Sequence, residues 1–76
     1  MPRTVGILIF DDVEVLDFAG PFEVFGVAGK RGEPEKPFHV FTLAEKAGPV
    51  IARNGLSLNP TYTLQYAPPL DILLIP

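Results

Sequence analysis

The fold is decided by the stretch VGILIFDDVEVLDFAGPFEVFGVAG, residues 5–29. It begins with an unbroken apolar run over residues 5–10, which shows no alternation of polar and apolar side chains. Such a run is typical of a strand that is buried on both faces, as in a parallel sheet covered by helices. Asp11 and Asp12 end the strand, because short acidic residues favour turns and caps.

The second half of this stretch predicts a helix, mainly over residues 20–29. Pro21 is tolerated in the first turn of a helix, where its missing N–H has no partner to lose. In a helix interior Pro21 would clash with the carbonyl group of Asp17. We therefore expect residues 13–19 to form a turn or a separate short helix, and Gly29 to end the helix.

Outward from this stretch, the chain alternates between loops and β-prone segments. Asn-Gly is the strongest short-range indication of a hairpin turn. The predicted segments are a charged surface loop over residues 30–37, a strand over 38–44, a turn at 48–49, a hairpin of 50–53 and 56–58 around Asn54-Gly55, a short extended piece or turn over 62–66, and a buried parallel strand over 70–75. A strand, a crossover helix and a second buried strand indicate a right-handed βαβ unit and an α/β fold.

The composition excludes several classes of site. The 76 residues contain no Cys and one His, which excludes a disulfide framework, a thiolate metal site and a cysteine nucleophile within them. A net charge of −3 argues against a nucleic-acid partner for this segment, since such a surface needs an excess of Lys and Arg. We expect no cofactor, no metal ion and no membrane partner, because the apolar runs are too short to cross a bilayer.

The size and hydropathy of the chain point to a part of a larger core. A chain this short buries little surface, yet 47% of its residues are hydrophobic and its mean hydropathy is +0.29. The apolar run at the N-terminus is too short for a signal peptide. We therefore expect a cytoplasmic location and a piece of a larger domain.

The motif Leu16-Asp17 followed by Gly20-Pro21, between an apolar strand with an acidic loop and an apolar helix, resembles the N-terminus of the ThiJ/PfpI (DJ-1/PfpI-like) superfamily. The resemblance is to the isonitrile hydratase-like branch and also to the sensor domains of AraC-type regulators. It implies a flavodoxin-like, class I glutamine amidotransferase-like three-layer sandwich with a mostly parallel sheet. It also implies that residues 1–76 are the N-terminal portion of one such domain, that the protein is a homodimer, and that a nucleophile Cys follows Pro76.

Asp17 is the candidate catalytic residue. The resemblance implies that an acidic residue at this point of the motif lies beside the nucleophile cysteine, where it can act as a general acid/base on the substrate. The alternative is that Asp17 caps the following helix or accepts a hydrogen bond from a loop amide. The sequence does not identify substrate-binding residues.

Other acidic residues are weaker candidates. Glu14 precedes Asp17 by three positions, so one helical turn would place both carboxylates on the same face, although an exposed loop Glu is the commoner case. Asp11 and Asp12 are expected to be turn and cap residues. A metal site formed by Asp11, Asp12 and Glu14 is rejected, because it lacks the spacing and the glycine of a calcium loop.

The remaining polar and glycine positions are given structural interpretations. His39 lies inside a strand without a companion ligand and is expected to be structural. Gly6 forms no G-x-G-x-x-G motif, which disfavours a dinucleotide site. Arg53 is expected to be a solvated hairpin charge. The helix face formed by Phe22, Val24, Phe25 and Val27 is assigned to core packing, to the dimer interface of the family, or to both.

Three functional hypotheses follow. The first is a portion of a cysteine-dependent hydratase or lyase that acts on a small electrophilic molecule such as an isonitrile, with Asp17 as general acid/base. The second is the ligand-sensing half of an AraC-type transcription regulator without catalysis, which predicts a helix-turn-helix segment further along. The third is a free-standing interaction domain, which predicts cooperative unfolding of the isolated chain.

Overall fold

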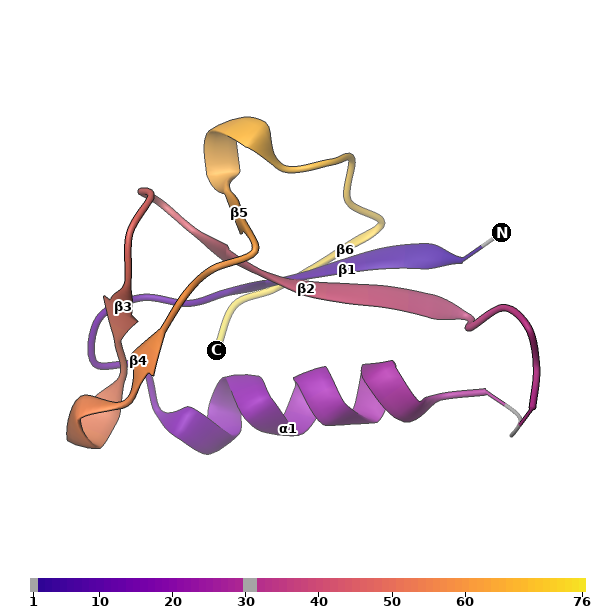
Figure 1. Cartoon of the computed structure of the whole chain (residues 1–76), viewed down its shortest axis with the longest axis horizontal. Coiled ribbons are helices and arrows are strands. Elements are labelled where there is room, and N and C mark those ends of the chain that lie inside the picture. Colours follow the sequence, from indigo (N-terminus) through magenta and orange to yellow (C-terminus); the bar gives the residue numbers. More distant parts are fainter. Residues whose placement is uncertain (1, 30–31) are drawn as a thin grey trace.

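The computed structural model describes residues 2–29 and 32–76 and shows a helix packed against a twisted sheet (Figure 1). The predicted loop residues Lys30 and Arg31 lie outside the described residues. In chain order the elements are β1 (Arg3–Leu8), α1 (Val15–Val27), β2 (Phe38–Ala44), β3 (Val50–Ile51), a 3-10 turn (Arg53–Gly55), β4 (Ser57–Leu58), β5 (Tyr62–Thr63), a second 3-10 turn (Leu64–Tyr66) and β6 (Ile72–Leu74).

The main sheet has the strand order β5-β2-β1-β6, and all of its pairings are parallel. On β1, Val5 pairs with Val40 of β2 on one side and with Ile72 of β6 on the other. The crossover from β1 to β2 runs through α1. The predicted α/β fold with a parallel sheet is confirmed, and the predicted bounds of the strand over 38–44 match β2.

The start of β6 is fastened to β1 by a reciprocal set of hydrogen bonds. The amide of Thr4 donates to Asp71 Oδ2 at 2.8 Å, and the amide of Asp71 donates back to the carbonyl oxygen of Thr4 at 3.1 Å. The Thr4 hydroxyl donates to the carbonyl oxygen of Pro69 at 2.7 Å. These bonds fix the register of two strands that are 67 positions apart at this contact.

Helix α1 covers one face of the sheet, and the main core lies between them (Figure 1). Alternate residues of β1 and the loop after it point to this face and are fully buried. Phe25 of α1 packs edge-to-face on Phe38 of β2, with ring centroids 4.9 Å apart. The buried members of this core are Val5, Ile7, Ile9, Val13, Phe18, Ala44, Val50 and Ala52.

The opposite face of the sheet is covered by the segment from β5 to the start of β6, which Figure 1 shows above the strands. Tyr62 packs edge-to-face on Phe41, with ring centroids 5.0 Å apart. Gly6 fits beneath the side chains of Leu43 and Leu70, whose methyl carbons lie 2.7 Å and 2.9 Å from the place a Cβ would take. The glycine therefore provides room for this second apolar layer.

The prediction that residues 70–75 form a strand buried on both faces is only half correct. The strand is present and parallel to β1, but it is the edge strand of the sheet and its side chains are half-buried or exposed. Leu73 and Ile75 are 49% and 66% exposed. The reason is that no helix covers this part of the second face in the described residues.

The predicted start of the helix at residue 20 is wrong. The helix begins at Val15 and runs through Pro21, which lies in its interior. Two features permit this. Gly20 has no Cβ to clash with the proline ring, so the usual restriction on the residue before proline is relaxed. Burial of Phe18 against the sheet, worth about 2 kcal/mol, offsets much of the proline cost of about 3 kcal/mol.

The turn predictions are confirmed with small shifts. The hairpin of β3 and β4 is antiparallel, and Asn54 and Gly55 adopt the positive φ angles of 65° and 83° that an Asn-Gly turn requires. Its loop has three residues rather than two, because the amide of Ala52 bonds to the carbonyl oxygen of Leu56. Helix α1 ends at Val27, two residues before Gly29 turns the chain with a φ of 106°. Residues 62–66 form both an extended piece and a turn.

Candidate functional site

The order of the strands defines where a site belongs in this sheet. From β1 the chain moves outward to β2 and β5, and then returns to place β6 on the other side of β1. The connections therefore change direction between β1 and β6. In open parallel sheets, ligands bind at such a switch point, beyond the carboxyl ends of the strands. The loop over residues 9–14 and the first turn of α1 follow directly from the carboxyl end of β1 and lie at this edge (Figure 1).

Asp17 lies in the first turn of α1, at the third helical position, and is exposed. Its amide donates to the carbonyl oxygen of Glu14 at 3.1 Å. Among residues 2–29 and 32–76, the structure shows no hydrogen bond or ion pair to its carboxylate. The alternative that Asp17 caps the helix is wrong, because Glu14 occupies the cap position and no side chain caps the helix. The Asp17 carboxylate thus stands near the positive end of the helix dipole without a structural partner.

Arg53, in the turn of the hairpin, binds two carboxylates of the loop before α1. Its Nη2 and Nε lie 3.0 Å and 3.3 Å from the two carboxylate oxygens of Asp12, which is a two-point contact. Its Nη1 lies 3.1 Å from Glu14 Oε2. We refer to Asp12, Glu14 and Arg53 as the Arg53 clamp. The prediction that Arg53 is a solvated charge of the hairpin is confirmed, since its side chain is half-exposed, and the structure adds two ion pairs that the sequence did not indicate.

The clamp shifts the pKa values of its members. The hydrogen bond from Arg53, and next its positive charge, lower the pKa of Asp12 below the ordinary value of an aspartate. The hydrogen bond and the charge of Asp12, followed by the charge of Glu14, raise the pKa of Arg53. Both charged forms are therefore favoured at neutral pH.

Backbone hydrogen bonds join the same two segments. The amide of Asp12 donates to the carbonyl oxygen of Ile51 at 2.8 Å, and the amide of Arg53 donates to the carbonyl oxygen of Val13 at 3.0 Å. The amide of Ile51 donates to Asp11 Oδ1 at 3.0 Å. Asp12 adopts a φ of 68°, a conformation that Asp tolerates better than most residues. The prediction that Asp11 and Asp12 are turn residues is confirmed, but neither caps the helix, because Glu14 occupies the cap position.

Glu14 is an exposed residue of the loop before α1, which confirms the commoner of the two interpretations, and its carboxylate binds Arg53 rather than sharing a helix face with Asp17. Glu14 precedes the helix rather than lying in it. The rejected metal site at Asp11, Asp12 and Glu14 is disfavoured further, because two of these carboxylates already bind an arginine. Sequence reasoning missed the clamp, since 39 and 41 positions separate Arg53 from its two partners and no local pattern marks them.

The helix face predicted from Phe22, Val24, Phe25 and Val27 is not a single face. Successive helical residues are turned by about 100°, so these four positions point in different directions. Phe25 faces the sheet and packs on the core, whereas Val24 and Val27 point away from it and are exposed. Leu16 is also exposed, at 77%. The outer side of α1 is therefore apolar as well as the inner side.

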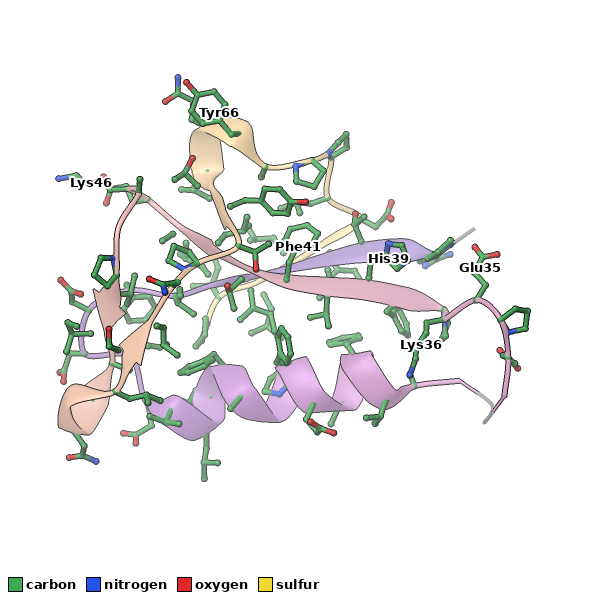
Figure 2. The ribbon with its side chains drawn as sticks, in the orientation of Figure 1. Glu35, Lys36, His39, Phe41, Lys46 and Tyr66 are labelled. Atoms are coloured by element: carbon green, nitrogen blue, oxygen red, sulfur yellow. The ribbon has the colours of Figure 1, made fainter. Side chains whose placement is uncertain are left out.

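His39 lies in β2, as predicted, on the same side of the strand as Phe41 (Figure 2). It is exposed rather than part of the core. Lys36 reaches back to the end of α1, where its Nζ donates to the carbonyl oxygen of Gly26 at 3.2 Å (Figure 2). A cation at this end complements the helix dipole. Neither residue lies at the carboxyl edge of the sheet.

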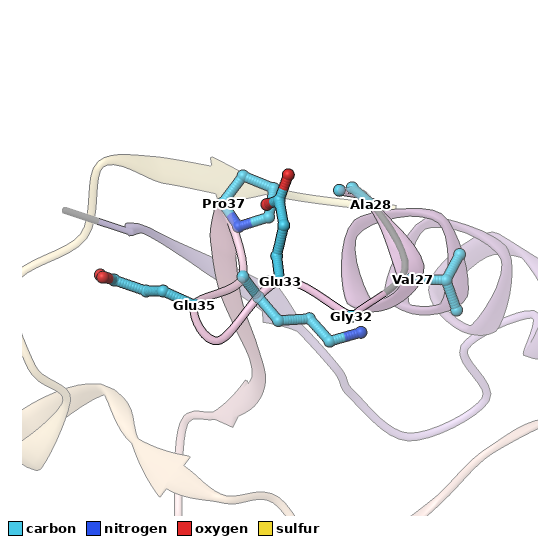
Figure 3. Close-up of a pocket in the computed structure, with 8 residues that line it drawn as sticks. Val27, Ala28, Gly32, Glu33, Glu35 and Pro37 are labelled. Atoms are coloured by element: carbon cyan, nitrogen blue, oxygen red, sulfur yellow. The ribbon is translucent and has the colours of Figure 1, made fainter.

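Among the cavities formed by the described residues, two lie at opposite ends of the strands of the main sheet. The larger, of about 480 Å³, lies between the end of α1 and the start of β2 and is lined by Val27, Glu33, Glu35 and Pro37 among others (Figure 3). The smaller, of about 310 Å³, lies at the carboxyl ends of β1 and β2, where Phe10, Asp11 and Lys46 line it. Asp17 lines neither cavity. In the described part of the chain, no three His, Cys, Asp or Glu side chains are placed to hold a metal ion.

Comparison with known proteins adds sequence similarity to this geometry. No family model matches the chain. Isonitrile hydratase from Pseudomonas putida is 32% identical to it over 76 residues, which is all of this chain and 30% of that protein. The crystal structure of a ThiJ/PfpI family protein from Pseudomonas syringae superposes on the whole chain with a TM-score of 0.82 and 25% identity. The whole length of the chain is therefore similar in sequence and in fold to part of a ThiJ/PfpI superfamily protein.

Two further solved structures share the fold of this chain. A candidate transcriptional regulator from Vibrio parahaemolyticus superposes with a TM-score of 0.77 at 23% identity, and a DJ-1 superfamily protein from Agrobacterium tumefaciens with a TM-score of 0.66 at 20% identity. The chain covers 39% and 37% of these two proteins and 29% of the Pseudomonas syringae protein. The chain thus spans about a third of the length of the proteins that it matches. Among its described residues, no helix is long and apolar enough to cross a bilayer.

Proposed function

We propose that this chain is the N-terminal portion of a ThiJ/PfpI domain that hydrates a small electrophilic molecule such as an isonitrile. The observation that carries the proposal is the Asp17 carboxylate, which lies exposed at the switch point of the sheet and is free of structural hydrogen bonds among the described residues. The similarity to an isonitrile hydratase over the full chain supports the substrate class.

In the proposed reaction, a cysteine that follows Pro76 in the longer protein supplies the nucleophile. Its thiolate sulfur forms a bond to the isonitrile carbon, and Asp17 gives a proton to the same carbon as a general acid. Water then adds to the carbon of the resulting thioimidate, and Asp17 takes one of its protons and is restored as the acid. The other water proton moves to the nitrogen, the carbonyl group forms, and the C–S bond breaks as the thiolate leaves. The sum is one isonitrile plus one water giving one N-substituted formamide.

The exposed apolar surfaces support the view that the domain continues beyond these residues. Leu73 of the edge strand β6 and Ile75, which follows this strand, are exposed on a face that lacks a covering helix in the described residues. We propose that the remainder of a flavodoxin-like sandwich covers this face. We also propose a cytoplasmic homodimer in which the outer side of α1, with Leu16, Val24 and Val27, contacts a second copy.

The experiment reads the open reading frame beyond Pro76, expresses its product, and follows the loss of a simple isonitrile by infrared absorption. We expect turnover that is abolished by Asp17→Asn and by Ala at the cysteine. Glu23→Gln serves as the control, because Glu23 is an exposed carboxylate further along the same helix. A product that lacks a cysteine at a strand-to-helix turn, or unchanged turnover in Asp17→Asn, contradicts the proposal.

The second candidate function is that of a ligand-sensing domain of an AraC-type regulator. The similarity in fold to a candidate transcriptional regulator favours it. It predicts that the longer protein carries a basic helix-turn-helix segment and binds a small molecule without consuming it. Calorimetric binding without turnover, together with DNA binding, would support this function over the hydratase.

A further inference from the structure

The hairpin of β3 and β4 lies beside the first turn of α1, although the two are far apart in sequence (Figure 1). It belongs to no part of the main sheet, since its two strands pair only with each other. Its turn and the strand before it bond to the loop that connects β1 to α1. The hairpin therefore contacts the loop that leads into α1, the helix that carries the candidate catalytic residue Asp17.

We propose that Arg53 is a positioning residue, which holds Asp17 at the switch point of the sheet by fixing the two residues through which the chain enters α1. The proposal rests on the proposed function of Asp17. Arg53 does not itself touch the reacting atoms in this assignment. It acts through Glu14 and Asp12, and no local sequence pattern marks this role.

The path from Arg53 to Asp17 has two steps. The Arg53 guanidinium binds Glu14 Oε2 at 3.1 Å, and the carbonyl oxygen of Glu14 accepts the amide of Asp17, also at 3.1 Å. The second bond is the first one of the helix, so it sets where the helix begins. No side chain caps this helix end, which leaves Arg53 as the side chain that restrains the cap residue from outside.

The contact with Asp12 restrains the other end of the entry loop. Asp12 holds a positive φ, which Asp adopts more readily than most residues but which is still less favourable than extended backbone and needs support from the surroundings. The two-point contact with Arg53 and the backbone bond to Ile51 impose it here. Val13, which lies between Asp12 and Glu14 in the sequence, is buried, and its carbonyl oxygen accepts a hydrogen bond from the amide of Arg53. Arg53 therefore restrains the chain on both sides of a buried anchor.

A planar guanidinium is suited to this task and an ammonium is not. Arginine can bind two carboxylates at once through separate N–H groups in a rigid fork, whereas lysine is a flexible point charge. Replacement of Arg53 by lysine therefore distinguishes positioning of the loop from neutralisation of the Asp12 and Glu14 charges. If Arg53 only offset the charge of Asp12 and Glu14, lysine would replace it. If Arg53 positions the loop, lysine would fail to do so.

The test compares amide hydrogen-exchange protection in the longer protein with that in its Arg53→Gln and Arg53→Lys variants and in the control variant Arg3→Gln. Arg3 is an exposed arginine at the amino end of β1, away from the loop that precedes α1. We expect both changes at Arg53 to reduce protection of the Asp12 and Asp17 amides about two- to five-fold, the range for an exposed ion-pair network. Strand β2 and the Arg3→Gln protein keep the protection of the unmodified chain.

Three results would overturn the proposal. They are unchanged protection in Arg53→Gln, full protection in Arg53→Lys, and an equal loss of protection in β2, which would mean general destabilisation. In the longer protein, Arg53→Gln and Arg53→Lys should both lower kcat while leaving KM in place. If Asp17→Asn leaves turnover unchanged while the exchange results hold, the proposed function fails and the restraint on the loop stands by itself.

Discussion

Replacement of Pro21 by Ala should stabilise the chain. Pro21 lies in the interior of α1, where it cannot donate a hydrogen bond to the carbonyl oxygen of Asp17. A proline in a helix interior destabilises the folded state by about 3 kcal/mol. It also restricts the unfolded chain, which stabilises the fold by about 0.4–1 kcal/mol. Because Gly20 already relieves part of the clash, we expect a net gain of about 1–2 kcal/mol in the free energy of unfolding.

The assay is urea and thermal unfolding followed by far-ultraviolet circular dichroism. A gain of this size raises Tm by about 5–15 °C in a domain of this length. Pro49→Ala is the matched control, since Pro49 lies in a turn outside the helix. It should lower stability slightly, by about 0.4–1 kcal/mol, because only the restriction of the unfolded chain is lost.

A second substitution makes this reasoning sharper. In the presence of Pro21, Gly20→Ala should destabilise, because the new Cβ meets the proline ring. In the Pro21→Ala background the same change should stabilise by about 1 kcal/mol, since Ala favours helix over Gly. The surroundings do not interfere, because no other atom lies within 4 Å of a Cβ at Gly20. Stabilisation by Gly20→Ala in both backgrounds, or no effect of Pro21→Ala, would refute the account.

Three further predictions concern the clamp, the core and the turn. Because its pKa is lowered, ionised Asp12 stabilises the folded chain above the ordinary aspartate pKa, and this stabilisation is lost as the pH falls through the lowered pKa of the folded state. Hydrogen-exchange protection of the Arg53 amide should decline over the same pH range. Asp12→Asn should abolish this pH-dependent decline. Ile7→Ala should lower the free energy of unfolding by about 3 kcal/mol in urea titration, because Ile7 is completely buried, and a change below about 1 kcal/mol would contradict its place in the core. Asn54→Val should cost about 1–2 kcal/mol and Asn54→Gly should not, since the position has a φ of 65°; equal stability of the two variants would contradict a turn strained by its conformation.

The sequence predicted those parts of the fold that depend on local chemistry. The bounds of β2 and the hairpin turn follow from β-prone residues and from the tolerance of Asn54 and Gly55 for positive φ. The start of α1 was predicted wrongly because Pro21 was weighed without the burial of Phe18, which is a tertiary contact. The exposure of β6 could not be read from its composition, since an apolar run does not reveal what covers it.

The candidate site divides in the same way. Asp17 was identified through a motif, and the structure adds its position in the first helical turn at the switch point. The role of Arg53 could not be predicted, because an arginine beside a turn is normally solvated and its partners are distant in sequence. Long-range ion pairs depend on the fold as a whole and leave no periodic pattern in the chain.

The bonds between Thr4 and Asp71 have a consequence for the order in which the chain assembles. The first partner strand that becomes available to β1 during synthesis is β2, which follows it after the crossover through α1. Strand β6 comes much later, since Asp71 is synthesised 67 positions after Thr4, the residue that it contacts. Each doubling of the number of residues between two paired strands adds only about 0.6 kcal/mol to the entropy cost of bringing them together. The later synthesis of β6 is therefore a larger obstacle to its pairing than this added entropy cost. Until Asp71 has left the ribosomal tunnel, one edge of β1 stays open to any other extended chain. Pairing of β6 with β1 thus ends the period in which this side of β1 can pair wrongly.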